Sequence, residues 1–123
     1  MQSILLLSGA LLAGCLASAD RLECSKAQPT GSTGLERETP AQIADVGASV
    51  SGGGENAVAE IASEVRARNP RASKGEIVNY LVTAYCPQVD RKTGLDVAAK
   101  RAELRAFAAR AYRIVAAVPA PPA

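Results

Sequence analysis

The chain has 123 residues, carries a formal net charge of +2 and contains no histidine. This length leaves room for one small domain, and so small a charge excludes a polyelectrolyte. The lack of histidine removes the commonest general base and metal ligand, and an aromatic content of 3% predicts an aliphatic core that needs a covalent cross-link.

The N-terminal part of the chain is apolar. Residues 4–12 are almost entirely hydrophobic, but such a run is too short to cross a bilayer, which takes about 20 residues. It is typical of the hydrophobic region of a secretory signal peptide. The preceding residues 1–3 contain no lysine or arginine, so the positive charge that usually opens such a signal is missing.

Two processing sites overlap directly after this run. Leu12-Ala13-Gly14-Cys15 resembles the lipobox of bacterial lipoproteins, and the resemblance covers only this motif and the apolar run. It implies that residues 1–14 are removed as a signal peptide and that acyl chains on Cys15 hold the protein in a membrane. The alternative is Ala17-Ser18-Ala19, a site for ordinary signal peptidase that leaves a soluble chain starting at Asp20.

The remaining cysteines, Cys24 and Cys86, form an even pair. In an exported chain such a pair predicts a disulfide. It would close a loop of about 60 residues and stabilise the domain by about 4 kcal/mol in the chain-entropy model. Two reduced thiols with separate roles are the alternative.

Residues 15–54 are expected to form a linker that contains a candidate short helix at 40–50. Thr39 is a suitable N-cap, Pro40 suits the first helical position, and Gln42 completes a capping box. Gly47 within this stretch weakens the prediction, and the glycine triplet at 52–54 should end it.

Three further helices are predicted in a domain over residues 55–118. The first covers 55–68. The second covers about 74–85, begins with the capping box Ser73–Glu76 and should end at Pro87; being apolar over much of its circumference, it should be central. The third runs from the looser capping signature at residues 93–96 to about Val118. Residues 119–123 are expected to form a disordered tail. We therefore expect an all-α bundle of three helices, or of four if residues 40–50 join it.

Two expectations concern individual side chains. Lys100 should lie on a solvent-exposed face of the last helix, with Asp96 one turn away as its ion-pair partner. The three tyrosines, Tyr80, Tyr85 and Tyr112, should lie in the core or at its rim.

Positive charge gathers in the second half of the chain, most densely at Arg66, Arg68, Arg71 and Lys74 around the predicted turn after residue 68. Such a cluster is a candidate site for an anionic envelope polymer, a lipid head group or an acidic protein. The alternative is a structural role, in which these side chains solvate the turn and pair with Glu60, Glu64 and Glu76.

These patterns predict a binding protein. A cysteine nucleophile would lack its usual histidine base, so we expect no enzymatic activity. We also expect no metal site and no cofactor. Nucleic acid is an unsuitable partner for an exported chain with so few aromatic side chains. The expected protein is a small lipoprotein on the periplasmic side of a bacterial membrane, and the alternative is a soluble periplasmic or secreted binding protein or inhibitor.

Overall fold

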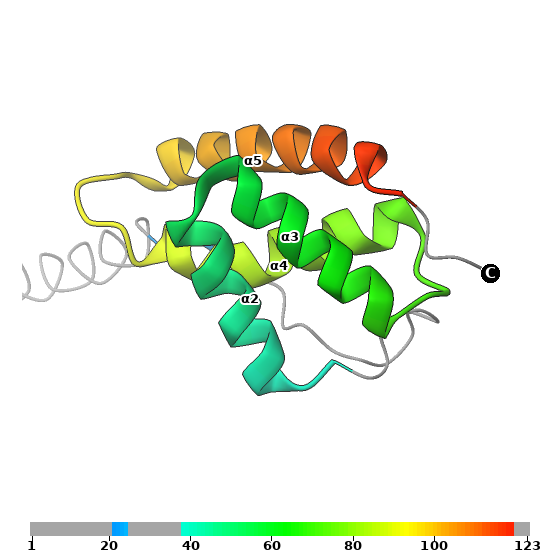
Figure 1. Cartoon of the computed structure of the whole chain (residues 1–123). Helices are drawn as coiled ribbons and strands as arrows, with labels where there is room; N and C mark the ends of the chain where they lie inside the picture. The colour runs from blue at the N-terminus through cyan, green and yellow to red at the C-terminus, as the bar shows by residue number, and fades with distance from the viewer. Residues whose placement is uncertain (1–20, 25–37, 120–123) are drawn as a thin grey trace, which may run out of the picture.

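The computed structural model describes residues 21–24 and 38–119, and every regular element in these ranges is an α-helix. Figure 1 shows the four helices: α2 (Pro40–Gly52), α3 (Gly54–Arg68), α4 (Lys74–Asp90) and α5 (Val97–Ala117). α4 and α5 run in opposite directions, and α2 and α3 lie on the side of α4 that faces the viewer. The predicted all-α class is confirmed.

Side-chain caps define where three helices begin. The Thr39 hydroxyl accepts from the Gln42 amide while the Gln42 side chain accepts from the Thr39 amide, and Ser73 and Glu76 form the same reciprocal pair. Asp96 caps α5 by accepting from the Ala99 amide at 2.8 Å. Each cap satisfies amides that have no partner within the helix.

Pro87 does not end α4, contrary to the prediction. The helix continues through it to Asp90, although proline cannot donate the usual hydrogen bond to the preceding turn. Val89 beyond it is fully buried, and the Arg91 amide donates to the Pro87 carbonyl. Packing of this last turn therefore outweighs the lost hydrogen bond.

The core is built around α4, which contacts the three other helices. Its largest fully buried side chains are aliphatic, apart from one phenylalanine: Phe107, Ile77, Leu81, Val58, Val65, Val89 and Val115. α2 contributes Val46 and Val50 to this core. A helix therefore covers the candidate stretch at 40–50 and packs on the core, and the described residues contain four helices.

Close approach of α2 to α4 explains the glycine inside α2. A methyl group added at Gly47 would lie 2.2 Å from the carbonyl oxygen of Ala84. Only a residue without a side chain fits there, because a real contact of this kind needs more than 3 Å.

The tyrosines differ from one another. Tyr80 and Tyr85 are buried, and the Tyr85 ring lies 4.2 Å from the Phe107 ring between centroids. Tyr112 is 60% exposed, so its predicted place at the core was wrong. It follows Ala111, which faces the core, and each helical step turns the next side chain by about 100°.

Candidate functional site

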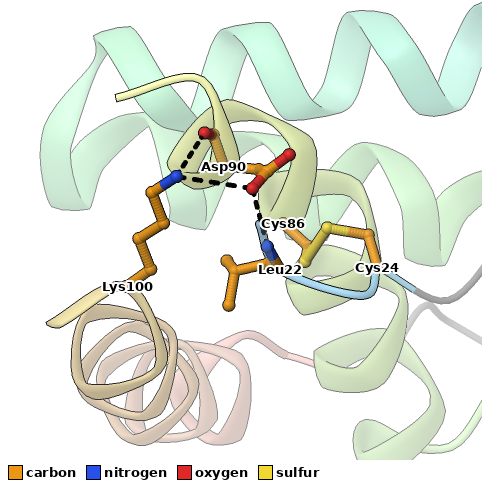
Figure 2. Close-up of a disulfide and its surroundings, with 5 residues drawn as sticks. All are labelled: Leu22, Cys24, Cys86, Asp90 and Lys100. Atoms are coloured by element: carbon orange, nitrogen blue, oxygen red, sulfur yellow. Dashed lines mark hydrogen bonds and ion pairs between the residues drawn. A yellow bond between two sulfur atoms is a disulfide. The ribbon is translucent and has the colours of Figure 1, made fainter. Parts of the chain in front are cut away.

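The predicted disulfide is present. Cys24 and Cys86 are bonded, with their Cα atoms 5.7 Å apart and 62 positions apart in sequence. Cys86 is in the last part of α4, so the bond holds the short N-terminal segment 21–24 against this helix (Figure 2). Cys15, the predicted lipidation site, lies outside the described residues.

Asp90 joins the same segment to the start of α5. The Leu22 amide donates to Asp90 Oδ1 at 2.7 Å, and Lys100 Nζ donates to the Asp90 carbonyl oxygen at 2.7 Å (Figure 2). Lys100 Nζ also lies 3.5 Å from Asp90 Oδ1. The hydrogen bond from Leu22, followed by the charge of Lys100, lowers the pKa of Asp90.

Lys100 therefore differs from its prediction. It is buried, at 4% exposure, and its ammonium group contacts Asp90 across the α4–α5 loop. Asp96, its expected partner, instead caps α5. Helical spacing indicated a polar position, but the loop brings Asp90 and its carbonyl over that position and supplies the hydrogen bonds that a buried ammonium group requires.

The cluster at Arg66, Arg68, Arg71 and Lys74 is divided among several partners. Arg68 forms a bidentate pair with Glu38, with Nη2–Oε1 and Nε–Oε2 distances of 2.7 and 3.0 Å. This partner is not one of the three carboxylates expected from the sequence. Because the Arg68 guanidinium binds a carboxylate that is itself buried, little of its charge remains for an external ligand.

Two other members of the cluster contact the C-terminal end of α5. Lys74 Nζ donates to the Ala116 carbonyl at 3.2 Å, and Arg66 Nη1 donates to the Val118 carbonyl at 3.5 Å. Cations are favourable there because the last carbonyls of a helix have no intrahelical partner and carry partial negative charge. Arg71 is exposed. Three of the four residues thus have partners within the fold: Glu38 for Arg68, and carbonyl groups at the end of α5 for Lys74 and Arg66.

Glu38 is the residue that sequence reasoning missed. It is 4% exposed and accepts hydrogen bonds from Arg68, from Asn69 Nδ2 at 3.0 Å and from the Tyr80 hydroxyl at 2.6 Å. Burial alone raises the pKa of Glu38, but the hydrogen bonds from Arg68, Tyr80 and Asn69 outweigh it and lower the pKa to about 2. Burial and then the bond to Glu38 raise the pKa of Tyr80. Because Glu38 belongs to a polar stretch of the sequence, nothing in its surroundings there indicated that it is buried and binds Arg68, Asn69 and Tyr80.

Two shallow grooves lie on the bundle. One, of about 460 Å³, runs between α2 and α4 beside the disulfide and is lined by Ile43, Ala48 and Pro87 among others. The other, of about 580 Å³, lies between α3 and α5, where Glu55 faces Arg110 and Arg113. In residues 21–24 and 38–119, histidine, cysteine, aspartate and glutamate nowhere form a group of three that could hold a metal ion.

None of the helices in the described ranges is both long and apolar enough to cross a membrane. No protein-family model matches the chain, and no curated protein or solved structure is significantly similar to it.

Proposed function

We propose that this protein is a small bacterial envelope lipoprotein, anchored through Cys15, that acts without catalysis as a binding module at the membrane surface. The observation that carries the proposal is the Cys24–Cys86 disulfide. It supports an oxidising compartment, and it accounts for two of the three cysteines. Cys15, directly after Leu-Ala-Gly, is the remaining thiol and the one that a lipobox would modify.

The attachment of residues 21–24 to the bundle suits an anchored protein. Only residues 16–20 separate Cys15 from Arg21, and six extended residue steps span at most about 20 Å. Because Cys24 and Leu22 are tied to α4, an anchor on Cys15 would keep the whole bundle close to the lipid surface. The proposed partner is anionic, as the basic second half of the chain suggests.

The alternative proposal is a soluble periplasmic or secreted binding protein, or an inhibitor, cut after Ala19. It is supported by the Ala17-Ser18-Ala19 motif. The disulfide fits it equally well, because both forms are exported.

Two measurements separate these proposals. The intact mass of the protein purified from membranes should show a Cys15 N-terminus with acyl chains, not an unmodified Asp20 N-terminus. Cys15→Ser should move the protein to the soluble fraction, whereas the control Ala17→Leu, which impairs only the alternative site, should leave it in the membrane. An unmodified Asp20 terminus, or an unchanged distribution of Cys15→Ser after the membranes are washed with 0.5 M salt, would reject the lipoprotein proposal.

A further inference from the structure

The outward face of α5 is basic along its length. Its exposed positions are occupied by alanine, arginine and one tyrosine: Ala98, Arg101, Ala102, Arg105, Ala106, Ala109, Tyr112, Arg113, Ala116 and Ala117. We call these residues the outer face of α5. The one carboxylate within Val97–Ala117 is Glu103, which accepts hydrogen bonds from Lys92 and from Tyr85 of α4. Its charge is therefore paired on the side of α5 that faces α4.

Acidic side chains gather on other helices. Asp45 of α2 and Glu55, Glu60 and Glu64 of α3 are exposed. α2 makes no contact with α5, because α4 lies between them. α3 does contact α5, and Glu55 shares a groove with Arg113, so the charge of the outer face is least opposed around Arg101 and Arg105.

The N-terminal segment reaches the bundle at the same end as Arg101. Leu22 binds Asp90, and Asp90 binds Lys100, the residue before Arg101 (Figure 2). The turn between α3 and α4 is at the opposite end of α5, where Lys74 contacts Ala116. Residues 100 and 116 are separated by about 24 Å along a helix that rises 1.5 Å per residue.

Exposed charges at the end near the N-terminal segment are mostly basic. Exposed carboxylates there are Glu23 and Asp96, and Asp96 already accepts from the Ala99 amide. The exposed cations are Arg21, Arg91, Lys92, Arg101 and Arg105, and Lys92 pairs with Glu103. Arg21 is close enough to Asp90 for its charge to lower the pKa of that carboxyl group.

From this arrangement we infer that the outer face of α5, through Arg101 and Arg105, binds the anionic phospholipid head groups of the membrane in which Cys15 is anchored. This inference rests on the proposed function and identifies its partner. The short chain after Cys15 brings the Arg101 end of α5 to the lipid surface, and α2, with its acidic Asp45, then lies on the far side of α4. The alanines between the arginines let the backbone approach the head groups closely, and Tyr112, the large uncharged side chain of the outer face, lies beyond Arg101 and Arg105 toward the other end of α5. Binding is therefore electrostatic.

The test compares two pairs of substitutions that change the net charge equally. Arg101→Gln with Arg105→Gln removes two charges from the outer face, and Arg71→Gln with Lys74→Gln removes two from the α3–α4 turn. Both double substitutions are made in the Cys15→Ser protein, which is purified in the form that the cell produces. Neither variant then carries acyl chains that could bind the vesicles. Each is sedimented with vesicles of phosphatidylcholine containing or lacking phosphatidylglycerol, at 0.1 M salt, after thermal melting has shown equal folding.

The partition coefficient on phosphatidylglycerol vesicles should fall about tenfold or more for the outer-face pair and less than about threefold for the turn pair. Neutral vesicles should not distinguish the proteins, and 0.5 M salt should abolish the difference. Equal losses for the two pairs, a larger loss for the turn pair, or no preference for anionic vesicles would overturn the inference. Retention of Cys15→Ser in cell membranes washed with 0.5 M salt, which removes electrostatic binding, would instead reject the anchor, so the two failures are distinguishable.

Discussion

The backbone amide of Leu22 donates a 2.7 Å hydrogen bond to Asp90, a residue 68 positions later in the chain. Asp90 is one turn beyond Cys86, which is bonded to Cys24. The N-terminal segment is thus held twice on the last turns of α4, once covalently and once through a carboxylate that Lys100 also contacts. Such double attachment fixes residues 22–24 on the end of α4.

The covalent attachment should be essential for stability. Cys86→Ser should lower the free energy of unfolding by about 4 kcal/mol, because the open chain gains the entropy of a loop of 62 residues. For a domain of this size the melting temperature should fall by more than about 10 °C. Calorimetry under non-reducing conditions measures this, and wild-type protein treated with a reductant should melt like the variant. Reactivity of both Cys24 and Cys86 in a thiol titration of the native protein would contradict the disulfide.

The attachment through Asp90 should be detectable separately from the disulfide. Asp90→Ala removes the acceptor of the Leu22 amide and the carboxylate oxygen 3.5 Å from Lys100 Nζ, but keeps the backbone carbonyl to which Lys100 also donates. We expect faster hydrogen exchange at the Leu22 amide, while amides in the middle of α3 keep their protection. Asp45→Ala, at an exposed position of α2, is the control and should leave exchange at Leu22 unchanged. Unaltered protection of Leu22 in the Asp90→Ala protein would show that the disulfide alone holds the segment.

Local signals in the sequence predicted the helices well. Thr39 with Gln42 and Ser73 with Glu76 specify helix starts within four residues, and both capping boxes form as expected. The disulfide was also predictable, because two cysteines that remain as a pair in a chain predicted to be exported leave few alternatives. The prediction that Pro87 ends α4 was wrong because it considered only the hydrogen bond that proline removes from the helix. The burial of Val89, which favours a further turn, depends on the packing of the whole bundle.

Glu38 and Lys100 show what local patterns do not contain. Glu38 meets Arg68 and Tyr80 across 30 and 42 positions, and in sequence it belongs to a polar stretch that predicts a linker. Helical periodicity places the Lys100 side chain away from the apolar stripe of α5, but it does not decide whether that side chain meets solvent or another segment. Only the tertiary structure shows that Asp90 lies against it. The basic cluster was visible in the sequence, but its partners at Glu38 and at the end of α5 were not.

Glu38 should make the protein sensitive to acid. Its pKa is lowered from 4.5 to about 2 in the folded state, so the ionised form stabilises the fold at any pH above 4.5. This stabilisation, about 3 kcal/mol at most, should be lost as the pH falls from 4.5 towards 2, because the unfolded chain then binds the proton more readily. Urea unfolding at a series of pH values measures it.

Two variants isolate this effect. Glu38→Gln should be less stable than wild type by about 3 kcal/mol at pH 7, since Arg68 loses its charged partner, and the difference should shrink steadily below pH 4.5. Glu60→Gln, at an exposed position of α3, should follow the wild-type curve throughout. A constant difference between Glu38→Gln and wild type from pH 7 to pH 2 would mean that the Glu38 charge does not stabilise the fold.

The contact between α2 and α4 gives the last prediction. Replacing glycine by alanine inside a helix usually stabilises it by about 1 kcal/mol, but a methyl group at Gly47 would lie 2.2 Å from the Ala84 carbonyl oxygen. That oxygen belongs to the backbone of the central helix, so α2 must move away from α4. The cost of such overpacking is typically 1–3 kcal/mol. We expect Gly47→Ala to lower the free energy of unfolding by up to about 2 kcal/mol in total, measured by urea denaturation. Gly52→Ala is the matched control, because no heavy atom lies within 4 Å of the added methyl group, and it should be neutral or slightly stabilising. If Gly47→Ala were as stable as Gly52→Ala, the close approach of α2 to Ala84 would be wrong, and with it the inclusion of α2 in the packed bundle.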